Sequence, residues 1–325
     1  SARAQESGTE NLHSLVDETL ANNPEIESAF QKMQMTDQSV PQAAALSDPE
    51  VTFKLMEIPG IQFNKAMYAN VGIEQIVAYP SKLSTRKEIA IVQSEHAHHE
   101  HAEKILDVLT QLKSSYAMLW FARQVLQINR ENQQLLLQVQ EIVRANYAAG
   151  RASQPEVLRT NVELERLKSE EASFHQEIAS AESMLRAMLN RSNDAAVGRV
   201  ALEPFTPLQL SYAELLAFAR KHRPMLIHDS LSIIEGALRV SLMKQEYIPD
   251  FKLSFEYVTY PGQMRSTWTA MAGVSIPFAP WTLSKASARV QEATSEEAMR
   301  RSMFRANSNM LTSLVRDSYA KVKSL

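Results

Sequence analysis

The residues with the most evident chemical potential lie in one short stretch, Glu95-His-Ala-His-His-Glu-His101. On a helix, His96 and His99 share one face, and His98 and His101 share another, because residues three apart are neighbours on the helix surface. Neutral imidazoles at this spacing can bind zinc or copper. The other reading is a solvated polar stretch of a long helix. We favour that second reading and predict no metal site, with metal binding as the alternative.

Other chemistry-bearing patterns are missing from the sequence. It has no Ser-His-Asp arrangement, no glycine-rich phosphate loop and no convincing carboxylate pair. It also has no cysteine, which excludes disulfides and thiolate chemistry. The net charge of −3 lacks the basic signature of nucleic-acid binding. We therefore predict a protein that is not an enzyme, with no catalytic residue, no cofactor and no nucleic-acid partner.

The elements that carry these residues are predicted to be mainly helical. Only 8 of 325 residues are glycine, well below the usual ~7%, and glycine weakens helix interiors. Residues 85–147 contain no glycine or proline and are predicted to form one long helix, followed by a return helix over 154–190. Apolar residues recur at coiled-coil spacing on the first helix at Ile105, Leu109, Leu112, Tyr116, Leu119, Leu135, Val139 and Ile142. On the return helix the corresponding positions are Val157, Leu164, Leu167, Glu171, Phe174, Ile178, Ala181, Leu185 and Met188.

A tight turn at 148–153 is predicted to join these two helices as antiparallel neighbours. Gly150 suits the left-handed residue that follows a helix. Ser153 and Glu156 form a capping-box pattern, in which hydroxyl and carboxylate bind free backbone N–H groups. Pro155 is tolerated in the first helical turn. The pattern indicates the end of a helical hairpin.

Two segments alternate with period two and are predicted to form β-hairpins over 49–78 and 249–278. Their strands are expected near 49–58, 68–78, 249–260 and 266–278, with turns at Gly60 and Pro261-Gly262. One face of the second hairpin is apolar and includes Phe251, Leu253, Phe255, Tyr257 and Trp268. Such alternation is typical of membrane strands, and equally of a hairpin that packs one face on a soluble core. The sequence has no run of 18 apolar residues, so it predicts no transmembrane helix.

The chain also repeats itself at a spacing of 200 residues. Pro24 matches Pro224, Pro49 matches Pro249, and Pro80-x-x-Leu-Ser matches Pro280-x-x-Leu-Ser. We predict a disordered segment over 1–11, a first repeat over 12–210 and a second repeat over 211–325. The second repeat is expected to be incomplete, with a helix, the second hairpin and a long helix from about 285, but no second helical turn.

These features together resemble the TolC-type outer-membrane efflux protein family, also called outer membrane factors. The segment from Tyr147 to Leu158 is similar to that family's Tyr-x-x-Gly-x-x-Ser-x-x-Asp/Glu-Val-Leu turn. Leu15 through Asn22-Asn23-Pro24 is similar to its opening motif, and Val274-Ser-Ile-Pro-Phe278 to its last strand end. The order of helix, hairpin, long helix, turn and helix, followed by the incomplete second copy, matches the family's order over nearly the whole chain.

The resemblance implies an outer-membrane protein with a periplasmic extension, which forms a homotrimer when full length. Each chain would give four strands to a twelve-stranded β-barrel, and long antiparallel helices to an α-barrel tunnel. The protein would be a passive exit duct for substrates delivered by an inner-membrane pump and a periplasmic adaptor, and lipid would contact the apolar strand faces. The helical turn would lie about 90 Å from the hairpins and dock the adaptor through Tyr147, Gly150, Arg151, Ser153 and Glu156. The alternatives are a heavy-metal efflux channel of the same type and a soluble periplasmic helical scaffold or adaptor.

Overall fold

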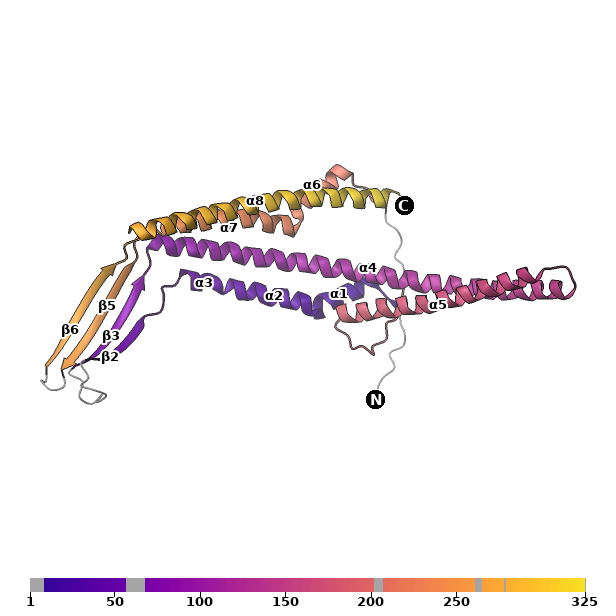
Figure 1. The fold of residues 1–325 in the computed structure, drawn as a ribbon, viewed down its shortest axis with the longest axis horizontal. Coiled ribbons are helices and arrows are strands. Elements are labelled where there is room, and N and C mark those ends of the chain that lie inside the picture. The colour runs from indigo at the N-terminus through magenta and orange to yellow at the C-terminus, as the bar shows by residue number, and fades with distance from the viewer. Residues whose placement is uncertain (1–8, 57–67, 202–206, 261–264, 278, 325) are drawn as a thin grey trace. The chain divides into compact units, whose positions relative to one another are not determined.

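The computed structural model describes residues 9–56, 68–201, 207–260, 265–277 and 279–324 (Figure 1). The helices are α1 (Leu12–Asn22), α2 (Pro24–Asp37), α3 (Ser39–Ala44), α4 (Pro80–Ala148), α5 (Gln154–Met188), α6 (Tyr212–His222), α7 (Pro224–Gln245) and α8 (Pro280–Lys323). The strands are β1 (Thr9–Glu10), β2 (Glu50–Met56), β3 (Tyr68–Val77), β4 (Arg199–Val200), β5 (Phe251–Tyr260) and β6 (Arg265–Val274). The hairpin turns predicted at Gly60 and Pro261-Gly262 lie outside the described residues.

The chain forms two compact units, each built from two separate stretches. The first contains residues up to 29 and 102–207, and the second contains 30–101 and 208–325. The bounds of these units differ from those of the two predicted repeats. The units are defined by which residues pack together, whereas the repeats were predicted from similarity between two parts of the sequence. Three pairs of helices nevertheless begin 200 residues apart: α1 and α6, α2 and α7, and α4 and α8. The boundary between the two repeats at residue 210 stays a prediction.

The core of the first unit lies where α1 packs on α4 and α5. Its buried residues are Leu15, Leu112, Tyr116, Leu119, Ala181, Leu185, Met188 and Leu189. The Tyr116 hydroxyl accepts a hydrogen bond from the Ala201 N–H at 3.0 Å, so the polar atom of this buried side chain has a partner. The apolar positions predicted on the return helix are confirmed at Leu164, Leu167, Ala181, Leu185 and Met188, which are buried. Hydrophobic burial is thus strongest at the base of the helical hairpin.

Further along the hairpin, the buried side of α4 differs from the prediction. Leu135, Val139 and Ile142 are exposed, whereas Asn129 and Gln140 are buried. The polar residues can be buried because they find polar partners on α5. Gln140 donates to Asn161, and Asn129 donates to Glu170 at 3.5 Å. Gln133, which lies between them on the same side, donates to Glu171 at 2.8 Å. A hydrogen-bonded polar contact therefore replaces the expected apolar one.

The sheet of the second unit has the strand order β2-β3-β5-β6, with every neighbouring pair antiparallel. Two hairpins far apart in the sequence are joined through β3 and β5, which pair from Ala69 with Thr259 to Val77 with Phe251. The helical part of this unit contains most of α2, α3, the start of α4, α6, and the packed pair α7 and α8 (Figure 1). In the described part of the chain, no helix is both long enough and apolar enough to cross a lipid bilayer.

The N-terminal segment is ordered earlier than predicted. Residues 1–8 of the predicted disordered segment lie outside the described residues, but Thr9 and Glu10 pair in parallel with Arg199 and Val200. Arg191 fixes this contact by donating to Glu10 at 2.7 Å and to both carboxylate oxygens of Glu18 at 2.7 and 2.6 Å. Bidentate guanidinium–carboxylate pairs hold a definite geometry. The ion-pair cluster therefore ties the start of the chain to the end of α5.

Candidate functional site

One face of the sheet is a continuous apolar surface exposed to the surroundings. The five residues predicted on this face all lie on it, in β5 and β6: Phe251, Leu253, Phe255, Tyr257 and Trp268. Trp268 stacks on Phe255 at 5.0 Å between ring centroids and contacts Tyr257 at 4.6 Å. Yet Trp268 remains 66% exposed. Aromatic rings that pack on each other but stay open on the outer side form a surface for an apolar environment.

The same face continues across the first hairpin, which the predicted residue set left out. Cross-strand neighbours share a face, and the register places Phe53 beside Val71 and Val71 beside Tyr257. Val51, Phe53, Leu55, Val71 and Ile73 are all exposed. The signal for them was present in the sequence as period-two alternation, but only the register shows that both hairpins contribute to one surface.

The opposite face of the sheet is polar and carries paired charges. Lys54 lies 3.4 Å from a carboxylate oxygen of Glu256, which also accepts a hydrogen bond from Asn70 at 2.8 Å. Lys252 pairs with Glu74 on the neighbouring strand. The two faces of the sheet thus differ sharply in polarity, and each suits a different medium.

A buried lysine joins the base of the sheet to the start of α4. The ammonium group of Lys82 donates to the Ile248 carbonyl oxygen at 2.7 Å and to Asp250 Oδ1 at 2.8 Å. Asp250 Oδ1 also accepts from the Tyr79 N–H at 3.0 Å, and the Asp250 N–H donates to Ser275 Oγ at 2.8 Å. Burial raises the pKa of the Asp250 carboxyl, but the hydrogen bonds from Lys82 and Tyr79 outweigh it and the net shift is downward. No sequence pattern indicated this junction.

The turn after α4 has the predicted backbone geometry. Gly150 has φ +71°, and no atom lies within 4 Å of the place where a side chain would start. Its N–H donates to the Tyr147 carbonyl at 3.0 Å, and the Arg151 N–H donates to the Asn146 carbonyl at 2.7 Å. These two bonds define a Schellman motif, which satisfies the last carbonyls of a helix.

On the other side of this turn, α5 begins with the predicted capping box between Ser153 and Glu156. The Ser153 N–H donates to Glu156 Oε2 at 3.0 Å. The Glu156 N–H faces the Ser153 side chain in this box and also donates to the Ser153 carbonyl at 3.1 Å. The five residues predicted to dock a partner, Tyr147, Gly150, Arg151, Ser153 and Glu156, are all exposed. The turn therefore has a hydrogen-bonded backbone and accessible side chains.

The histidine stretch on α4 is divided among different neighbours. His96 packs against His228 of α7, with 4.4 Å between ring centroids, and burial lowers its pKa. His98 contacts Asp37 at 3.2 Å, and His101 lies 5.8 Å from the Phe30 ring. His98 and His101 therefore both face α2, as their spacing predicts, but they have separate partners. Within the described ranges, no three His, Cys, Asp or Glu side chains converge as a metal site.

Comparison with known proteins adds independent information. A family model described as outer membrane efflux protein matches residues 15–191. Among solved structures, the outer-membrane channel OprN matches at 14% identity and a TM-score of 0.77, over 96% of this chain and 73% of that chain. VceC from Vibrio cholerae matches at 18% identity and a TM-score of 0.70, over 95% and 79%. The CmeC outer membrane channel of Campylobacter jejuni matches at 12% and 0.72, over 94% and 72%. No curated protein sequence matches. The predicted fold class is confirmed.

Proposed function

Because this chain belongs to the outer membrane efflux protein family, we propose that it is the outer-membrane channel of a tripartite efflux system. It catalyses no reaction and acts as a passive exit duct. An inner-membrane pump and a periplasmic adaptor deliver the substrates. The protein resides in the outer membrane and extends into the periplasm. The observation that carries this proposal is the two-faced sheet, whose apolar aromatic face is exposed while its polar face holds paired charges.

The apolar face supports contact with lipid rather than with a soluble core. A soluble scaffold would cover Trp268 and Phe53 with its own residues, but both are about two-thirds exposed. The polar face of the same sheet suits the water-filled side of a channel wall. The alternative of a soluble periplasmic adaptor is therefore disfavoured.

The unpaired edges of the sheet support assembly as a homotrimer. β2 and β6 are the two edge strands, and an exposed edge presents unpaired N–H and C=O groups that seek another strand. In a membrane every backbone polar group requires a partner, so the edges must close on other copies. Three copies of four strands would give a closed barrel of twelve.

A second apolar stripe on α4 also supports this assembly. Phe121, Ile128, Leu135 and Ile142 recur every seven residues, and each is more than half exposed. A heptad stripe that the described residues leave this exposed fits a helix from a neighbouring copy. Leu135→Glu should shift the purified protein from trimer to monomer in light scattering, whereas Gln134→Glu, one residue away and also exposed, should not. Equal behaviour of both variants would contradict the role of this stripe.

The lipid contact is tested by two neighbouring residues on opposite faces of β6. A cation on the lipid side of a membrane strand costs about 2–4 kcal/mol near the bilayer midplane. Trp268→Lys should therefore abolish recovery of the protein in the outer-membrane fraction. Thr269→Lys should leave it unchanged, because Thr269 pairs with Glu256 on the polar face. Normal membrane recovery of Trp268→Lys would overturn the assignment.

The docking role of the α4–α5 turn is tested at Gly150. A β-branched residue cannot readily adopt φ +71°, whereas Asn tolerates this conformation. Gly150→Val should raise drug susceptibility of a complemented deletion strain while membrane insertion stays intact, and Gly150→Asn should complement normally. Equal loss of insertion and transport would indicate a folding defect instead.

A further inference from the structure

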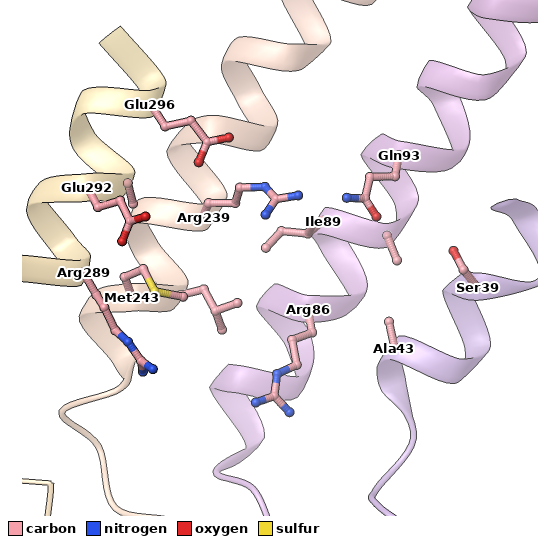
Figure 2. Close-up of a pocket in the computed structure, with 13 residues that line it drawn as sticks. Ser39, Ala43, Arg86, Ile89, Gln93, Arg239, Met243, Arg289, Glu292 and Glu296 are labelled. Carbon is pink, nitrogen blue, oxygen red and sulfur yellow. The ribbon is translucent and has the colours of Figure 1, made fainter. Parts of the chain in front are cut away.

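A groove of about 480 Å³ lies among four helices of the second unit, α3, α4, α7 and α8. Three arginines from three different helices line it: Arg86 of α4, Arg239 of α7 and Arg289 of α8. Figure 2 shows Arg239 reaching from α7 towards α4, while the guanidinium groups of Arg86 and Arg289 lie towards the same end of the groove. We call this site the arginine groove.

The three guanidinium groups retain many unused hydrogen-bond donors. Each arginine has five N–H donors. Arg239 uses two of them on Glu235, at 2.7 and 3.0 Å, and Arg289 uses one on Glu246 at 2.6 Å. Arg86 makes no hydrogen bond or salt bridge with any residue that the structure describes, although its charge helps to lower the pKa of Asp250. Most of the donor capacity that lines the groove is therefore available to a ligand.

The carboxylates of the groove do not offset this excess of donors. Glu296 is already held by Arg300, which donates to it at 2.7 and 3.2 Å. Glu292 is the one lining carboxylate that pairs with none of the described residues, and it is exposed. A ligand with one anionic group would therefore find more unsatisfied partners here than a cationic ligand.

The rest of the lining is apolar. Ile89, Ala90 and Ala293 are almost fully buried beneath the groove, and Leu242 and Met243 complete the apolar wall. A thioether side chain adapts its shape to irregular ligands. Sites that bind small molecules commonly combine such an apolar wall with a few placed polar groups, in volumes of about 300–1,000 Å³.

We propose that the arginine groove binds an amphipathic organic anion, with one carboxylate, sulfonate or phosphate group on Arg86 and Arg289. The apolar body of this ligand lies along Ile89, Leu242 and Met243. A planar guanidinium matches the paired oxygens of such a group and is the preferred residue for bidentate recognition of it. The site belongs to a single chain, so it does not depend on the proposed efflux role.

The test is a ¹⁹F-NMR titration of the purified full chain with 4-(trifluoromethyl)phenylacetate. The uncharged 4-(trifluoromethyl)phenylacetamide is the matched probe, and empty detergent micelles correct for partitioning. The acid should bind saturably, and the amide at least about tenfold more weakly, because its uncharged group forms weaker hydrogen bonds with guanidinium groups than a carboxylate does. Arg86→Gln should weaken binding of the acid by roughly tenfold to a hundredfold and leave the amide unchanged.

Two further variants make the result specific. Arg144→Gln removes an exposed arginine from the other unit and should leave the affinity for the acid unchanged. Ala43→Phe places a ring in the groove and should abolish binding of both probes. Thermal unfolding of each variant shows that it is folded. The proposal is overturned if Arg86→Gln binds the acid as tightly as the unmodified chain, if Arg144→Gln weakens binding equally, or if the amide binds as well as the acid.

Discussion

The junction between Lys82 and Asp250 leads to a quantitative prediction about which partner matters more for stability. The Lys82 side chain is 6% exposed, whereas that of Asp250 is 31% exposed. Removing Asp250 leaves a buried ammonium group with the Ile248 carbonyl as its remaining acceptor. Removing Lys82 leaves a carboxylate that water can reach and that still accepts from the Tyr79 N–H. The two single substitutions should therefore have unequal costs.

The magnitudes follow from the two environments. An uncompensated buried charge costs about 3–5 kcal/mol, so Asp250→Ala should lower the free energy of unfolding by about 3 kcal/mol. Lys82→Met removes the buried charge and fills its space with an apolar chain of similar length. It should cost about 1 kcal/mol, which is typical for a lost hydrogen-bonded contact. The double variant should cost about as much as Lys82→Met alone, because no buried cation then remains.

The assay is guanidinium chloride unfolding of the purified protein in detergent, followed by tryptophan fluorescence. Tyr79→Phe is the matched control, since only the Tyr79 backbone N–H takes part in the junction. It should leave the unfolding midpoint within error of the unmodified chain. If Lys82→Met costs as much as Asp250→Ala, or if the two costs simply add in the double variant, the reasoning from burial is wrong.

Two more predictions concern the first unit and the sheet. The hydrogen bonds from Arg191 lower the pKa of Glu18, so the stability they confer is complete above the unfolded-state pKa and is lost as the pH falls through the folded-state value. Unfolding curves from pH 7 to pH 3 should show this loss, and Glu18→Gln should reduce the slope. In the sheet, a Cβ at Gly72 would lie 3.0 Å from the Cγ of Glu256, whereas one at Gly273 would meet nothing nearer than 3.7 Å. Gly72→Ala should therefore destabilise the protein by about 1 kcal/mol and Gly273→Ala much less, as measured by the same unfolding assay, and equal effects would contradict the packing argument.

Local structure was largely predictable from the sequence. The left-handed residue at Gly150 follows from a glycine just after a long helical pattern, and it is found at φ +71°. The long helix begins at Pro80 rather than at 85, since proline is well suited to the first helical turn. The strand positions follow from period-two alternation, and the helix starts from prolines and caps. These signals depend on a residue and its near neighbours, so one sequence contains them.

The choice of partners required the tertiary structure. α4 carries two heptad stripes, and hydrophobicity favoured Leu135, yet the chain buries Asn129 and Gln140 instead. That choice depends on polar residues of α5 that lie opposite, which periodicity within one helix cannot reveal. The pairing of β3 with β5 joins residues more than 100 positions apart, and so does the groove in which Arg86 meets Arg239 and Arg289. The sequence determined which surfaces each element offers, and packing between distant elements decided which of them are buried, paired or left open.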